Sequence, residues 1–193
     1  KYLISRDISD DDVWYFKLGF SDEPKWRRRV IVPSFDKDGE LNHYVARAID
    51  KFKRPKYETP EGERDHVIFN ELNIDWSRRL VLCEGTFDMM KCGDNVVPLL
   101  GSDLNENSAL FSSILVNNTP IALALDSDMK LSKMPRIAKK LMEYDIDVLV
   151  VDVKSDPGEM SKREFRTALA AARPYAWEES FLAKLDRATR VAL

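Results

Sequence analysis

The sequence has few of the features that define membrane, secreted or zinc-binding proteins. It contains no run of about 18 apolar residues, so no transmembrane helix is predicted. Its opening, KYLISRDISDDD, lacks the apolar core of a signal peptide. Two cysteines cannot form a four-ligand zinc site, and the two histidines lie at no zinc-finger spacing. Because a disulfide framework is also absent, we expect a cytoplasmic protein without a membrane partner.

A global excess of positive charge is also absent, since the formal net charge is −3. Positive charge is nevertheless concentrated locally, in Arg27–Arg29 and in the stretch 51–56, which holds four basic residues. Such a strip can bind phosphate on a mildly acidic protein, and the alternative is a solvated face. The first residue is lysine rather than methionine, so we expect a fragment of a longer protein.

The 193 residues, 44% of them hydrophobic, suit one globular unit or two small subdomains. Residues 1–75 predict a small α+β subdomain. Ser9 is a candidate N-cap, and Asp38-Gly39 between two β-rich runs indicates a hairpin. The expected elements are a helix over 9–18, strands over 27–36 and 41–49, and a loop rich in proline, glycine and charge over 52–63.

Residues 76–193 alternate between apolar runs and helical patterns. Apolar strands that are each followed by a helix predict a parallel sheet covered on both faces, so the fold class is α/β. Strands are expected over 79–84, 96–100, 121–126 and 148–153. Helices are expected over 86–91, 105–115, 132–144, 161–172 and 177–190.

Acidic residues follow three of these strands, at the sheet edge where open α/β folds form their sites. Carboxylates brought together there repel one another and raise one another's pKa, and a divalent cation relieves the repulsion. Ligands that are all oxygen favour Mg²⁺ or Mn²⁺. Ordinary roles are also open, because an acid suits a helix start and Asp before Pro-Gly suits a turn. The acids are Glu84, Asp88, Asp126, Asp128, Asp156 and Glu159.

Four stretches resemble the TOPRIM domain. LVLCEGTFDMMK resembles its Glu-Gly-x-x-Asp motif, and ALALDSD resembles its Asp-x-Asp motif. KSDPGEM is similar to a later acidic element of phage primases, and PLLGSDL to the Gly-Ser loop of primases. The resemblance implies a TOPRIM fold with a parallel sheet flanked by helices.

The first 75 residues resemble the opening of the DnaG-type primase core. YLISRDIS, RVIVPSFDKDGELNHYVARAI and RPKYETP follow the family order. The chain is therefore identified as a member of the RNA polymerase domains of DnaG-type primases, of phage or mobile-element type. We expect a basic N-terminal subdomain over 1–75, a TOPRIM catalytic domain over 76–160 and C-terminal helices over 161–193.

This resemblance implies an enzyme that makes short RNA primers on single-stranded DNA from NTPs by nucleotidyl transfer. It implies two or more Mg²⁺ or Mn²⁺ ions and a replicative helicase, separate or on the same chain, as partner. Asp126 and Asp128 would be metal ligands, and Glu84 a ligand or general base. Asp88, Asp156 and Glu159 would complete the metal shell. Residues implied at the nucleic acid or NTP are Arg6, Arg47, Lys56, Tyr57, Gly101 and Ser102.

The sequence departs from the family pattern at three places. Asp7 stands where the family usually has glycine, and MKLSK follows the Asp-x-Asp motif without the common glycine. Pro-Gly-Glu replaces Pro-x-Asp, which brings Glu159 forward as the second acid. A TOPRIM nuclease and a non-catalytic nucleic-acid-binding module are the alternatives.

Overall fold

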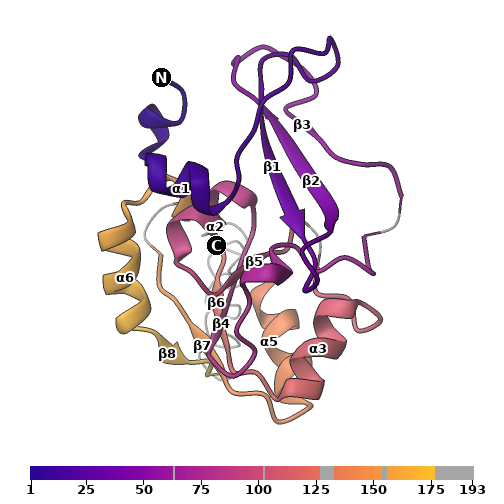
Figure 1. The fold of residues 1–193 in the computed structure, drawn as a ribbon. Coiled ribbons are helices and arrows are strands. Elements are labelled where there is room, and N and C mark those ends of the chain that lie inside the picture. Colours follow the sequence, from indigo (N-terminus) through magenta and orange to yellow (C-terminus); the bar gives the residue numbers. More distant parts are fainter. Residues whose placement is uncertain (63, 102, 127–132, 154–155, 177–193) are drawn as a thin grey trace, which may run out of the picture.

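The computed structural model describes residues 1–62, 64–101, 103–126, 133–153 and 156–176. It contains two sheets, each with its own connectivity (Figure 1). A three-stranded antiparallel sheet has the order β1-β2-β3, and a five-stranded sheet has the order β5-β4-β6-β7-β8. The α/β class predicted from the sequence is confirmed, as is the small mixed subdomain before the larger sheet.

The N-terminal part begins with a 3₁₀ turn, η1 (Ile4–Arg6), and helix α1 (Asp10–Tyr15). Ser9 caps α1 as predicted, because its hydroxyl accepts from the Asp12 amide while the Asp12 carboxylate accepts from the Ser9 amide. The helix ends at Tyr15, with Phe16 as its C-cap, and is shorter than predicted. Strands β1 (Arg29–Phe35) and β2 (Leu41–Ala48) form the predicted hairpin.

The third strand, β3 (Tyr57–Glu58), lies within the stretch predicted as a loop. Ala46 and Arg47 of β2 pair with its two residues, and the Ala48 amide donates to the Lys56 carbonyl. The strand could not be predicted from this sequence, which is rich in proline and glycine, because only the pairing with β2 defines it.

Beyond residue 76, strands and helices alternate along the described chain, as predicted. Its four parallel strands are β4 (Leu80–Cys83), β5 (Val96–Pro98), β6 (Ile121–Ala124) and β7 (Val148–Val150). The edge strand β8 (Arg173–Pro174) is antiparallel to β7 and was not predicted. The 3₁₀ turn η2 (Glu71–Asn73) ends the first part. The helices and 3₁₀ turn of the second part are α2 (Thr86–Cys92), α3 (Ala109–Asn117), α5 (Met134–Met142), η3 (Pro157–Glu159) and α6 (Lys162–Ala170).

Alternate residues of the central strands enter two apolar cores, one on each face of the larger sheet. Val81 and Cys83 of β4 pack on the side of α2 and α6, whereas Leu80 and Leu82 pack on the side of α3 and α5. Figure 1 shows these helix pairs on opposite sides of the sheet. Burial on both faces explains why the strands are uniformly apolar.

The core on the α2 side also contains residues of the N-terminal part. Ile8, Phe16 and Val45 belong to the same buried cluster as Phe87 and Met90 of α2. The first 75 residues therefore rest directly on helix α2. The three-part division of the chain into 1–75, 76–160 and 161–193 stays a prediction.

A buried lysine reinforces this contact. The Lys91 side chain is only 1% exposed, and its ammonium donates to the Asp7 carboxylate at 2.9 Å and the Asp7 carbonyl at 2.6 Å. Asp7 adopts the left-handed conformation (φ 53°) that suited the family's glycine. In this chain, Asp7 supplies the counter-charge for Lys91.

Asp7→Asn is expected to lower the free energy of unfolding by about 1–2 kcal/mol, because a buried ammonium loses its anionic partner. Lys91→Met fills a similar volume without a charge and leaves the Asp7 carboxylate in water. The free energy of unfolding of this variant should therefore stay near that of wild type. Urea unfolding of both variants measures the two free energies and the difference between them. Equal losses would contradict this account of the pair.

No described helix is long and apolar enough to cross a membrane. The helix expected over 177–190 lies outside the described residues.

Candidate functional site

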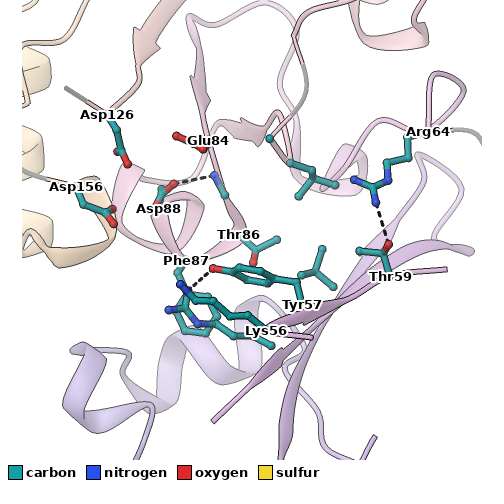
Figure 2. Close-up of a pocket in the computed structure, with 15 residues that line it drawn as sticks. Lys56, Tyr57, Thr59, Arg64, Glu84, Thr86, Phe87, Asp88, Asp126 and Asp156 are labelled. Carbon is teal, nitrogen blue, oxygen red and sulfur yellow. Dashed lines mark hydrogen bonds between the residues drawn. The ribbon is translucent and has the colours of Figure 1, made fainter. Parts of the chain in front are cut away.

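Four carboxylates line one cavity of about 360 Å³ at the carboxyl ends of the central strands. Glu84 follows β4, Asp88 lies in the first turn of α2, Asp126 follows β6, and Asp156 precedes η3. Figure 2 shows these side chains on one side of the cavity. The parallel order of β4 and β6 places their ends together, as the sequence predicted.

Asp88 is the most buried of these acids, and its pKa is raised. Its Oδ2 accepts a 2.7 Å hydrogen bond from the Gly85 amide, which caps α2. Burial and then the charge of Asp156 raise the pKa of Asp88 to about 7, and Asp126 adds to the effect. The cavity therefore concentrates negative charge around Asp88.

Gly158 fits between two of these carboxylates. A Cβ at this position would lie 2.7 Å from Asp88 Oδ1 and 3.1 Å from Asp156 Oδ1. The Gly158 amide also donates to Asp156 Oδ1 at 2.7 Å. A side chain here would displace both acids.

If Asp88 and Asp156 hold a divalent cation, Gly158→Ala is expected to weaken Mn²⁺ binding by about 10- to 100-fold, the usual loss when the support of a metal ligand is disturbed. Isothermal titration with MnCl₂ measures the change. Gly19→Ala is the matched control, because nothing lies within 4 Å of a Cβ there and Gly19 has no positive φ. Wild-type affinity in Gly158→Ala would contradict a metal site at Asp88 and Asp156.

The opposite wall of the cavity is basic and aromatic. Arg47 of β2, Lys56 just before β3, Tyr57 of β3 and Arg64 from the segment after it line this wall. Arg47 Nη1 donates to the Tyr57 hydroxyl at 2.6 Å, and the guanidinium lies 4.5 Å from the Phe87 ring centroid. Burial raises the pKa of Tyr57, so its hydroxyl stays protonated at neutral pH. Cations thus face carboxylates across the cavity (Figure 2).

Arg64 and Thr59 also line the cavity and were not predicted from the sequence. Arg64 Nη2 donates to Thr59 Oγ1 at 3.0 Å. A signal was present, because Arg64 follows Lys56 in the same charged segment. The composition of this segment is that of an ordinary solvated loop, and its position beside the cavity follows only from the fold.

Most of the predicted site residues meet at this cavity. Gly101 lines it with a φ of 79°, a conformation that favours glycine. Arg6 and Glu159 line a neighbouring cavity beside Asp7 and Lys91 instead. Asp128 and Ser102 lie outside the described residues.

The chemistry of the acidic wall fits Mg²⁺ or Mn²⁺. Neither histidine nor cysteine lines the cavity, so its charged donors to a cation are carboxylate oxygens. Within the described ranges, no three His, Cys, Asp or Glu side chains are already arranged to hold a metal ion. The raised pKa of Asp88 nevertheless indicates carboxylates that a cation would stabilise.

Comparison with solved structures identifies the fold. The catalytic domain of a DnaG primase bound to single-stranded DNA matches 95% of this chain and 74% of its own, at TM-score 0.72 and 16% identity. This chain has the fold of the DnaG primase catalytic core. The E. coli primase catalytic core matches 95% of this chain and 75% of its own, at TM-score 0.69 and 17% identity.

The Aquifex aeolicus primase, with its zinc-binding and RNA polymerase domains, shares the DnaG fold at TM-score 0.61. It matches 90% of this chain and 48% of its own at 22% identity. No protein-family model matches the sequence. No curated protein matches it either. The likeness to the DnaG fold therefore rests on the structures, whose sequences are only 16–22% identical to this chain.

Proposed function

We propose that this chain is the catalytic core of a DNA primase, a nucleotidyltransferase that makes short RNA primers on single-stranded DNA. The observation that carries the proposal is the cavity in which Glu84, Asp88, Asp126 and Asp156 face Arg47, Lys56 and Arg64. Nucleotidyl transfer needs both walls, because it joins a metal-binding centre to polyanionic substrates. One solved structure with this fold is described as bound to single-stranded DNA.

Each wall has a distinct task in this proposal. Asp126 and Glu84 would hold Mg²⁺ or Mn²⁺ together with Asp88 and Asp156, and Asp128 is proposed to join them. Bound divalent ions supply activation of the attacking 3′-hydroxyl and charge neutralisation at the leaving pyrophosphate. Glu159 stays a proposed contributor to the metal shell from the adjoining cavity.

The basic wall would bind the substrates. Lys56 and Arg64 offer charge to the phosphates of an NTP or the template. Arg47 is held by Tyr57 and Phe87, which fixes the direction of its guanidinium in the cavity. Tyr57 offers a ring face for stacking on a base. Gly101 allows close approach of backbone to substrate, and Arg6 and Ser102 stay proposed contacts.

A three-way assay tests the proposal. Purified protein is incubated with single-stranded DNA, labelled NTPs and Mn²⁺. Short RNA products are expected from a primase, whereas shortened DNA would indicate a TOPRIM nuclease. DNA binding without either product, even on a template already carrying an RNA primer, would indicate a non-catalytic module. The replicative helicase, a cytoplasmic setting and a phage or mobile-element origin stay predictions from the sequence.

A further inference from the structure

The three consecutive arginines 27–29 occupy different environments. Arg27 is exposed, and the Arg28 side chain pairs at the surface with Asp50. The Arg29 side chain is only 1% exposed. The sequence predicted a phosphate track or a solvated face for the triplet. Both predictions are wrong for Arg29, because its guanidinium points into the small sheet and away from solvent.

The buried guanidinium bridges three parts of the N-terminal sheet. Nη2 donates to the Pro55 carbonyl at 2.8 Å, and Nη1 donates to the Ala46 carbonyl of β2 at 3.2 Å. A longer contact of 3.5 Å joins Nη1 to the Lys56 carbonyl. Glu58 lies 3.7 Å from Nη2 and supplies a counter-charge. The planar fork of arginine suits several acceptors in fixed directions, which a lysine ammonium cannot match.

These acceptors surround Lys56 and Tyr57. Pro55 precedes the two residues, Glu58 follows them, and the Lys56 carbonyl is itself an acceptor. Strand β3 has only two residues, and its register with β2 rests on two residue pairs. Such a short strand has few ladder hydrogen bonds of its own to hold its side chains toward the acidic wall. The contacts of Arg29 compensate for this shortage.

We infer that Arg29 is a positioning residue that holds Lys56 and Tyr57 in the cavity without touching substrate. The inference rests on the proposed function, in which these two residues contact the nucleotide or template. Arg29 acts through the backbone on either side of Lys56, and the Lys56 side chain remains exposed. Through Tyr57 the same contacts also hold Arg47, since the Tyr57 hydroxyl accepts from its guanidinium.

A double-mutant cycle between Arg29→Met and Lys56→Met tests this inference. The assay is extension of an RNA primer annealed to a DNA template, with KM for NTP and kcat measured separately. Arg29→Met alone is expected to raise KM about tenfold, the equivalent of one lost charge-assisted hydrogen bond. In the Lys56→Met background it should raise KM by a smaller factor, because the part of its effect that acts through Lys56 is already lost and the part that acts through Tyr57 remains.

Arg29→Lys and an exposed cation serve as controls. Arg29→Lys keeps the charge but loses the fork, so its KM should fall between those of wild type and Arg29→Met. Lys37→Met removes an exposed charge paired with Asp38 at the far end of the hairpin, and KM should not change. Hydrogen exchange should accelerate in a peptide covering 54–60 of Arg29→Met and stay unchanged in one covering 80–92.

The outcomes separate this inference from the proposed function. If Arg29→Met raises KM equally in both backgrounds, or exchange accelerates throughout the protein, Arg29 has a general structural role and the inference fails. The proposed function would survive that result. If Lys56→Met itself leaves KM unchanged, the inference also fails, together with the proposed role of Lys56. Primer extension that is absent in wild type would contradict the proposed function directly.

Discussion

Asp126→Asn is expected to lower kcat/KM for primer extension by at least about 100-fold, while the protein stays folded. Asp126 follows β6, which is buried and hydrogen-bonded between β4 and β7. The strand therefore fixes the position of the carboxylate at the cavity. Asparagine has nearly the same shape but carries no charge, so the main loss is the affinity for a divalent cation.

Asp147→Asn is the matched control for this substitution. Asp147 lies at the amino end of β7, at the opposite edge of the same sheet, where it pairs with Arg79. Removing one surface ion pair has little effect on stability, and the cavity is unaffected. Thermal unfolding of both variants checks the fold. Near-normal activity in Asp126→Asn would remove Asp126 from the metal site.

Asp88→Asn is expected to stabilise the metal-free protein at pH 8 more than at pH 5. The pKa of Asp88 is raised from 3.8 to about 7 in the folded protein. Its contribution to stability is therefore complete below pH 4 and is lost as pH rises through 7. Asparagine resembles the protonated acid at every pH. Its advantage over wild type should grow by about 2–3 kcal/mol between pH 5 and pH 8.

Thermal unfolding in EDTA at the two pH values measures this difference. A shift of about 4–12 °C corresponds to that free energy for a chain of this size. MgCl₂ should then raise the Tm of wild type more than that of Asp88→Asn, because the cation offsets a repulsion that the variant lacks. An advantage that does not change with pH would mean that Asp88 is not the titrating group. Asp88→Asn should also lose primer extension, since the proposed metal shell includes Asp88.

The acidic half of the site could be predicted from the sequence because it depends on strand order. Apolar runs such as 121–126 indicate buried parallel strands, and an acid at the end of such a run must lie at the functional edge. Asp126 and Glu84 line one cavity, and their roles there stay a prediction. Glu159 was expected in the same cluster but lines the neighbouring cavity instead.

The basic half was less predictable because it depends on packing between distant segments. Arg64 comes to the cavity only through the path of the segment after β3. Arg29 is one of three consecutive arginines, and charge alone cannot tell which of them faces inward. Strand β3 has no hydrophobic pattern of its own, since its pairing with β2 and the contacts from Arg29 define it. These features arise from tertiary contacts and leave no periodic signal.

The central claim is that the cavity catalyses template-directed nucleotidyl transfer. Its most direct test supplies wild-type protein with an RNA primer annealed to a defined DNA template, Mn²⁺ and a single labelled NTP. If the proposed function holds, the primer grows only when the NTP is complementary to the next template base, and EDTA or Asp126→Asn abolishes growth. A primer that never grows, or that grows equally with mismatched NTPs, would contradict it.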